Sequence, residues 1–203
     1  MDATIPFPRS PELMSRHDSA LLVVDIQTRL VDALAPLPTL IWNVRRLLDG
    51  AQALSVPFAA TEQYPRGLGP TVAPLAERLG AIPSKLMFSC RERHEIFESW
   101  KERGIFKILV VGIETHVCVQ QTVLDLLGAG FRVWVAVDAV ASRFPLDRDT
   151  ALRRMESSGA TLTTTEAALF EWCEVAGTPE FKIISQLVRE LPPANGLPQS
   201  DTP

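Results

Sequence analysis

The stretch 110–122 places a cysteine, Cys118, where a thiol can act as a nucleophile. Apolar residues up to Val111 predict a strand that ends at Gly112, and an apolar-periodic helix after a short polar turn carries Cys118 in its first turn. The N–H groups of a first helical turn lack partners within the helix and point their positive ends outward, so they lower the pKa of a thiol placed there. The other interpretation is that Cys118 is a small buried apolar side chain, as many free cysteines are.

Two side chains of complementary chemistry lie close to other predicted strands. Asp25 ends the apolar run 20–24, and Lys85 comes just before a weaker strand predicted over 86–88. A carboxylate can take the proton of a thiol and an ammonium group favours the thiolate, so these residues and Cys118 would form a coherent nucleophilic site. Taken singly, Asp25 also fits a turn or helix-capping role, and Lys85 fits a solvated surface amine.

Strand and helix signals alternate along the chain, and this alternation determines where the three side chains would meet. The predicted strands are 20–24, 56–60, 86–88, 107–111, 131–137 and 160–163, and the predicted helices are 39–54, 94–102, 118–127, 147–156, 167–174 and 178–191. Apolar strands that alternate with helices indicate parallel βαβ units, so we expect an α/β fold with three α-β-α layers around a mostly parallel sheet. Ligands bind such sheets at the carboxyl ends of the strands, which is the edge predicted for Asp25, Lys85 and Cys118.

Length and charge limit the class of protein. The 203 residues suit a single domain, which we place at 15–191, with residues 1–14 and 192–203 as flexible or subunit-contacting tails. The formal net charge of −4 and the lack of a Lys/Arg-rich run argue against a nucleic-acid partner. No apolar stretch approaches the roughly 20 residues needed to span a bilayer, so we expect no membrane partner.

The cysteine pattern and the N-terminal segment indicate a cytoplasmic protein. Cys90, Cys118 and Cys173 are an odd number and have no metal-type spacing, so neither a disulfide framework, a metal site nor a cofactor is expected. Residues 1–19 are rich in proline and contain both Asp and Arg, which does not suit a signal peptide. Cys90 and Cys173 are predicted to be buried or inert thiols.

Three motifs, taken together, resemble those of a known family. They are Asp25-Ile-Gln27 after the first strand, the lone Lys85 after Pro83-Ser84, and Gly112-Ile-Glu-Thr-His-Val-Cys118-Val. This combination is similar to that of the isochorismatase-like cysteine hydrolases, and the run 61–72 narrows the resemblance to the isochorismatase domain-containing proteins. The resemblance covers about residues 19–197, in order and without large gaps.

The resemblance implies a six-stranded sheet of Rossmann-like topology and a hydrolase with Asp25, Lys85 and Cys118 as its catalytic triad. It also implies a cis peptide bond between Ile113 and Glu114, and an oxyanion hole formed by the backbone N–H groups of Glu114 and Cys118. The implied reaction is hydrolysis of a C–N bond in a small amide-like substrate through a thioester on Cys118. The resemblance also implies that the protein forms a homo-oligomer.

Departures from patterns of the wider superfamily limit the choice of substrate. Nicotinamidases carry an Asp-x-His metal motif near the second strand, whereas this chain reads Thr61-Glu-Gln-Tyr-Pro-Arg66 without histidine, so we expect neither a metal nor nicotinamidase activity. Enzymes that hydrolyse the vinyl ether of isochorismate lack a cysteine at this position, so Cys118 argues against that reaction. Five residues are candidates for substrate binding: Gln27, Gln63, Tyr64, Phe88 and His116.

Three alternatives to an amide hydrolase stay open. The first is a non-catalytic or weakly active binding or scaffold protein that keeps the fold, and the second is isochorismatase-type hydrolysis. The third is a redox-sensing thiol, which predicts a resolving cysteine that the sequence does not obviously supply from Cys90 or Cys173. The intact set of Asp25, Lys85 and Cys118 favours an enzyme, because a protein without catalysis has no physical need for all three.

Overall fold

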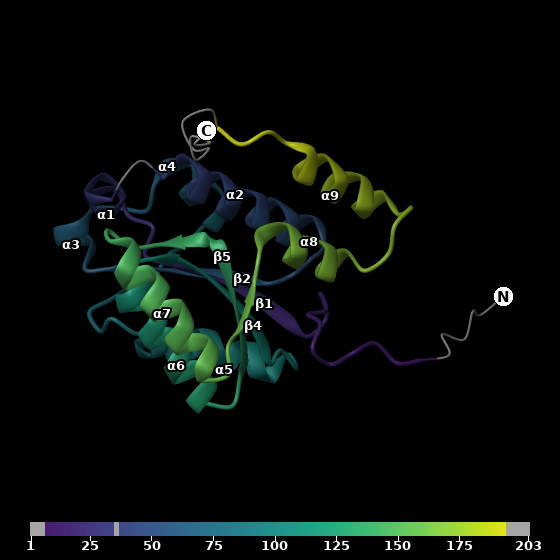
Figure 1. Cartoon of the computed structure of the whole chain (residues 1–203), viewed down its shortest axis with the longest axis horizontal. Coiled ribbons are helices and arrows are strands. Elements are labelled where there is room, and N and C mark those ends of the chain that lie inside the picture. The colour runs from purple at the N-terminus through teal and green to yellow at the C-terminus, as the bar shows by residue number, and fades with distance from the viewer. Residues whose placement is uncertain (1–6, 35–36, 194–203) are drawn as a thin grey trace, which may run out of the picture.

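The computed structural model describes residues 7–34 and 37–193, whose strands form one six-stranded sheet in the order β3-β2-β1-β4-β5-β6 (Figure 1). All neighbouring strands are parallel, which confirms the predicted α/β fold. The strands are β1 (Ser19–Val24), β2 (Phe58–Gln63), β3 (Ser84–Lys85), β4 (Lys107–Ile113), β5 (Arg132–Ala141) and β6 (Thr161–Thr163).

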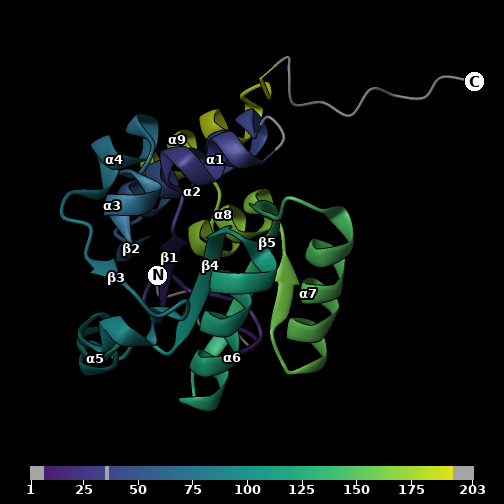
Figure 2. The same ribbon diagram turned by 90° about the vertical axis from the view of Figure 1, so that its left-hand side faces the viewer.

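Helices connect the strands and cover both faces of the sheet (Figure 2). The α-helices are α1 (Thr28–Ala33), α2 (Pro38–Ala53), α3 (Pro65–Leu68), α4 (Ala73–Leu79), α5 (His94–Glu102), α6 (Gln120–Gly128), α7 (Pro145–Ser157), α8 (Thr165–Cys173) and α9 (Pro179–Arg189). A 3₁₀ turn, η1 (Cys90–Arg93), precedes α5, and a wide π-helical turn, η2 (Thr115–Val119), precedes α6. Within the described ranges, no helix has both the length and the apolar character needed to cross a bilayer.

The side chains of the central strand β1 are buried on both faces of the sheet. Leu21 and Val23 point into a core shared with α2, α4, α8 and α9, whereas Leu22 and Val24 point into a core shared with α5, α6 and α7. Successive side chains of a strand alternate between the two faces, so a strand covered on both sides reads as a continuous apolar run.

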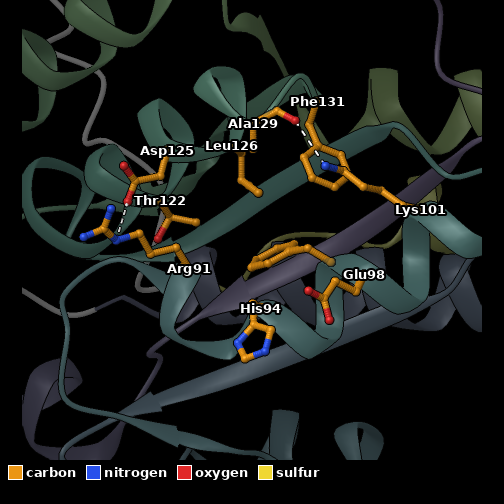
Figure 3. A pocket seen from close by; sticks show the side chains of 10 residues that line it. Arg91, His94, Glu98, Lys101, Thr122, Asp125, Leu126, Ala129 and Phe131 are labelled. Atoms are coloured by element: carbon orange, nitrogen blue, oxygen red, sulfur yellow. Dashed lines mark hydrogen bonds and ion pairs between the residues drawn. The ribbon is translucent and has the colours of Figure 1, made fainter.

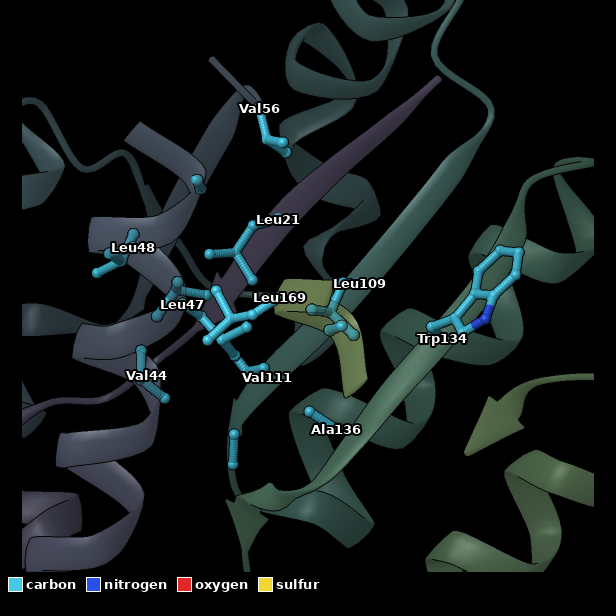
Figure 4. Packing of buried hydrophobic residues seen from close by; sticks show 14 of the residues in the cluster. Leu21, Val44, Leu47, Leu48, Val56, Leu109, Val111, Trp134, Ala136 and Leu169 are labelled. Atoms are coloured by element: carbon cyan, nitrogen blue, oxygen red, sulfur yellow. The ribbon is translucent and has the colours of Figure 1, made fainter. Parts of the chain in front are cut away.

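The core on the α2 side joins elements that are far apart in the sequence (Figure 4). Val44 and Leu47 of α2 lie in one buried cluster with Leu21 of β1, Val111 of β4 and Leu169 of α8. Full burial of a large apolar side chain contributes about 1.5–3 kcal/mol. This cluster therefore holds β1 and β4 side by side just below the edge where both strands end.

The third strand differs from the prediction. We predicted a strand over 86–88, but β3 is Ser84–Lys85 and the following segment is a loop, in which Leu86 is 70% exposed. The reason is that a side chain binds the backbone there: the Glu92 carboxylate accepts the N–H groups of Leu86 and Met87 at 2.8 and 2.6 Å. Lys85 is therefore the last residue of the edge strand.

The first described residues pack on the body of their own chain. Met14 is fully buried and its N–H donates to the Glu171 carboxylate at 2.7 Å, and Arg9 pairs with Glu174 at 3.0 Å. This part of the predicted tail 1–14 is thus attached within the chain. Residues 1–6 and 194–203 of the predicted tails lie outside the described residues.

Gly112 allows β4 to approach β1 closely at the edge where the strands end. A Cβ atom at this position would lie 2.1 Å from the carbonyl oxygen of Val24, and the backbone has a φ of +127°. Both features exclude an ordinary side chain. The chain therefore uses glycine where β4 brings the cysteine turn beside the end of β1.

We expect Gly112→Ala to lower the free energy of unfolding by more than about 4 kcal/mol, because the new methyl group meets backbone of a central strand. Gly128→Ala is the matched control, since no atom lies within 4 Å of its added Cβ and the residue is helical. Alanine there should change stability by no more than about 1 kcal/mol, in the stabilising direction. Urea unfolding of both variants measures this, and equal stabilities would contradict the close approach.

Candidate active site

Three chemically active side chains lie at the carboxyl edge of the sheet. Asp25 follows β1, Lys85 ends β3, and Cys118 lies in η2, the wide turn after β4. Their exposed fractions are 0%, 1% and 5%, so the three side chains lie almost out of contact with water.

Asp25 and Lys85 form a buried ion pair. The Lys85 Nζ atom lies 2.6 Å from Asp25 Oδ2, and both side chains are completely shielded from solvent. A buried pair is stable only when further hydrogen bonds satisfy its remaining donors and acceptors. Lys85 Nζ has these bonds, because it also donates to Gln63 Oε1 at 2.8 Å and to the Phe88 carbonyl at 2.8 Å.

Asp25 is held by both its backbone and its side chain. Its φ of +54° is unusual for a residue with a side chain, and its N–H donates to the Thr61 carbonyl at 3.2 Å. The Thr61 hydroxyl donates to Asp25 Oδ1 at 2.8 Å. Burial raises the pKa of Asp25 above its ordinary value, and the charge of Lys85 opposes this shift most strongly.

The Cys118 thiol lies beside the Asp25 carboxylate, and each of the two groups shifts the pKa of the other. Our expectation of a depressed thiol pKa is wrong for this structure. Burial, and after it the negative charge of Asp25, raise the pKa of Cys118 well above its ordinary value, and Lys85 opposes them only in part. Cys118 therefore rests as a thiol beside a proton acceptor, because burial and the adjacent carboxylate outweigh the helix start.

A second cysteine, Cys90, also lies at this site, which the sequence analysis did not predict. Its sulfur lies 3.3 Å from the Thr61 hydroxyl oxygen, and its backbone N–H donates to the Thr122 hydroxyl at 2.9 Å. Cys90 is fully buried, and burial raises the pKa of its thiol to about 11.

Strand periodicity could have identified Thr61. Thr61 and Gln63 are both buried on β2 and both contact the ion pair, whereas Glu62 between them points away and accepts from the Thr71 hydroxyl at 2.8 Å. Side chains two residues apart on a strand share a face. A site that contains Gln63 is therefore expected to contain the side chain of Thr61 as well.

Gln27 and Gln63, the two glutamines among the five substrate-binding candidates, use their side-chain amides in hydrogen bonds within the chain. The Gln27 amide donates to the carbonyls of Gln63 and Gly69 at 3.0 and 2.7 Å, and its oxygen accepts the Gln63 N–H at 2.7 Å. The Gln63 side chain accepts from Lys85 and donates to Leu86. These bonds fix the ends of β1 and β2, and contact of either glutamine with a substrate stays a prediction.

Tyr64 and Phe88 line two neighbouring surface pockets of about 400 Å³ each. Tyr64 is 51% exposed and shares its pocket with Lys85, Arg66 and Arg93. Phe88 is 52% exposed and lines a pocket on the α6 side of the 86–88 loop. Both aromatic rings are therefore accessible to a ligand close to the ion pair.

The cysteine turn is attached to the loop after β5. The His116 ring nitrogen Nδ1 lies 3.0 Å from the Ser142 hydroxyl oxygen, and the Glu114 carboxylate accepts from the Arg143 backbone N–H and from its Nε at 3.0 and 3.1 Å. The peptide bond between Ile113 and Glu114 is cis. These contacts hold the turn that carries Cys118.

A pocket of about 200 Å³ lies between α5 and α6, apart from the three catalytic candidates (Figure 3). An Arg91–Asp125 ion pair of 3.5 Å lies on one side, and the Lys101 ammonium lies 4.7 Å from the centre of the Phe131 ring on the other. Thr122, which binds the Cys90 backbone, also lines this pocket. Among the described residues, no group of three or more His, Cys, Asp or Glu side chains is arranged to hold a metal ion.

Comparisons with known proteins show which family and fold this chain shares. The family model described as "Isochorismatase domain" matches residues 19–167. Isochorismatase domain-containing protein 2 of Pongo abelii is 40% identical over 182 residues, which are 88% of this chain and 87% of that protein. The structure described as MAR1 ribonuclease from Caenorhabditis elegans has a TM-score of 0.83 and 39% identity, and the match covers 94% of this chain and all of that one.

Two bacterial structures add chemical information. YcaC from Pseudomonas aeruginosa, described with hexane-2,5-diol and covalent acrylamide, has a TM-score of 0.79 and 26% identity, over 89% of this chain and 93% of that chain. The YcaC product of Escherichia coli is described as an octameric hydrolase of unknown specificity. It has a TM-score of 0.75 and 25% identity, and the match covers 83% of this chain and 85% of that chain.

We expect Lys85→Met to lower stability by roughly 3–5 kcal/mol at neutral pH, because it leaves the Asp25 carboxylate buried without its cation. Burial already raises the pKa of Asp25, and loss of Lys85 raises it further. A carboxyl group whose pKa is higher in the folded state loses stability as pH rises, so the deficit should grow from about pH 5 to about pH 8.

Urea unfolding of the wild type and of Lys85→Met at both pH values measures this dependence. The double variant Asp25→Asn/Lys85→Met is the control, because an uncharged amide removes the buried charge and should recover most of the deficit at the higher pH. A deficit that does not change with pH would show that Lys85 acts through packing alone.

Proposed function

We propose, because the chain belongs to the isochorismatase domain family, that it is a hydrolase that uses Cys118 to cleave a C–N bond in small amide-like substrates. The observation that carries this proposal is the buried Asp25–Lys85 pair with the Cys118 thiol beside its carboxylate. A nucleophile, a proton acceptor and a fixed cation in one nearly dry place are the parts that covalent catalysis by a thiol requires.

Cys118 suits the role of nucleophile better than Cys90. Both thiols lie near Asp25, but Cys90 has no exposed surface, whereas Cys118 is 5% exposed. A substrate carbonyl carbon has to touch the attacking sulfur. Cys118 also lies in the turn where the N–H groups of Glu114 and Cys118 would bind an oxyanion, at roughly 3–4 kcal/mol per donor.

The first half of the proposed reaction forms a thioester. The Cys118 thiol gives its proton to Asp25 as the sulfur bonds to the substrate carbonyl carbon, and Lys85 stabilises the negative charge during this transfer. The carbonyl oxygen becomes an oxyanion that accepts hydrogen bonds from the Glu114 and Cys118 N–H groups. Collapse of this intermediate breaks the C–N bond, and the leaving amine takes the proton from Asp25.

The second half restores the enzyme. Asp25, again ionised, accepts a proton from a water molecule as the water oxygen attacks the thioester carbon. Collapse of the second intermediate breaks the C–S bond, and the sulfur recovers its proton from Asp25. The net reaction consumes one water and releases a carboxylic acid and an amine, so no cofactor is required.

The relatives support a small substrate and covalent chemistry. One bacterial relative is described with covalent acrylamide, a small molecule to which thiols add at the vinyl carbon, which supports a reactive nucleophile; another is described as a hydrolase. The low exposure of Cys118 also favours small acyl groups over bulky ones. We propose a homo-oligomeric assembly as well, because the Escherichia coli relative is octameric.

We expect Cys118→Ala to lower turnover of a small aliphatic or aromatic amide at least about 1,000-fold, because the acyl group loses its carrier. Cys173→Ala is the matched control, since it removes a buried free thiol of α8 that lies outside the site, and it should retain most activity. Mass spectrometry after rapid acid quenching should find the acyl group on the peptide that contains Cys118.

The substrate panel should also contain a vinyl ether and RNA, since one relative is described as a ribonuclease. Turnover of any member that survives Cys118→Ala would remove the nucleophile from this mechanism. Binding of an amide without turnover by the wild type would instead favour a non-catalytic protein.

A further inference from the structure

The hydrogen bonds around Asp25 continue beyond the three catalytic candidates. Asp25 Oδ1 accepts from the Thr61 hydroxyl at 2.8 Å, and the Thr61 oxygen lies 3.3 Å from the Cys90 sulfur. The Cys90 backbone then donates to the Thr122 hydroxyl at 2.9 Å. Thr122 lies four residues after Cys118, one turn further along the same helical segment. The contacts therefore form a ring from Asp25 back to the helix that carries the nucleophile.

The direction of each hydrogen bond in this ring follows from the charge on Asp25. An ionised carboxylate only accepts, so the Thr61 hydroxyl donates its single hydrogen to Asp25. A lone pair on the Thr61 oxygen is then left for the S–H of Cys90. Both side chains are buried, and the pKa of Cys90, raised to about 11, keeps that thiol protonated.

Thr61 also controls the orientation of the carboxylate. Its carbonyl accepts the Asp25 N–H, while its hydroxyl binds Oδ1 and the Lys85 ammonium binds Oδ2. The carboxylate, which follows β1, is thus held by a side chain from β2 and a side chain from β3, and it cannot rotate without breaking a buried bond. The charged groups and thiols that face it are Lys85 from β3, Cys118 from η2 and, behind Thr61, Cys90 from η1.

We propose that Thr61, supported by the Cys90 thiol, is a positioning residue that keeps Asp25 ionised and oriented as the proton acceptor of Cys118. Hydrogen bonds to the charged form of a carboxyl group lower its pKa. Thr61 thereby opposes the effect of burial on Asp25, in the same direction as Lys85. This inference rests on the proposed function, because it assigns a role within the same site.

The test compares Thr61→Val, which keeps the shape but removes the hydroxyl, with Thr61→Ser, which restores it. The readout is the rate at which iodoacetamide alkylates Cys118, followed by peptide mass spectrometry as a function of pH. We expect the acid limb of this profile to move up by about one pH unit in Thr61→Val, with a rate about tenfold lower below it. Thr61→Ser should stay within about twofold of the wild type.

Thr71→Val is the matched control. Thr71 is also a buried threonine whose hydroxyl binds a carboxylate, that of Glu62, but it lies outside the ring. Its substitution should leave the alkylation profile unchanged. A shift of the same size in Thr71→Val would show that any buried threonine has this effect, and would overturn the proposal.

Cys90 provides a second, independent test if Thr61→Val does not fold. Cys90→Ala should move the acid limb in the same direction by a smaller amount, and Cys90→Ser should return it toward the wild type, since a hydroxyl can donate to Thr61. Wild-type profiles in both Cys90 variants, or in a folded Thr61→Val, would overturn the proposal. Alkylation requires no substrate, so this result is separate from loss or survival of turnover in Cys118→Ala.

Discussion

The buried ion pair between Asp25 and Lys85 sets the strictest requirement on how the ends of the strands are arranged. Removing a carboxylate and an ammonium group from water costs several kcal/mol per ion, and their mutual attraction compensates only if every remaining donor and acceptor is satisfied. With both side chains at 0% exposure, the chain has to supply these partners itself. Gln63, Thr61 and the carbonyls of the 86–88 loop do so, and this requirement fixes the ends of β1, β2 and β3 relative to one another.

The same constraint explains the state of the nucleophile. A negative carboxylate beside a nearly buried sulfur opposes formation of the thiolate, so Cys118 rests as a thiol, and the start of a helical segment does not reverse this. The proton then leaves the sulfur only when Asp25 can accept it, which couples the reactivity of Cys118 to the ionisation of Asp25. A cysteine that stays protonated until it reacts is also less reactive toward oxidants than a permanent thiolate. In our proposal Thr61 and Cys90 control the ionisation of Asp25 and do not bind the substrate.

How far the fold and the site could be predicted depended on the kind of signal. The apolar runs before Asp25 and Cys118 were strong, because strands covered on both faces consist of apolar residues, and they predicted the parallel sheet and the edge with the chemistry. The short edge strand was placed wrongly at 86–88, since two-residue strands have no periodicity and Glu92 binds the backbone of Leu86 and Met87. The helices α1, α3 and α4 were missed because they are short and carry almost no buried residues.

Residue type, periodicity and the order of strands are local properties of the chain, so they were enough to predict most of the strands, the longer helices and the candidate triad. The resemblance of its motifs also identified the family. Which groups surround these three residues follows from the fold: Thr61 contacts Asp25 and Cys90 contacts Thr61, and both contacts depend on how β2 and η1 pack beside β1. The tertiary structure also decided that the pKa of Cys118 is raised, since burial and the distance to a carboxylate are properties of the folded chain and not of the residues near Cys118 in the sequence.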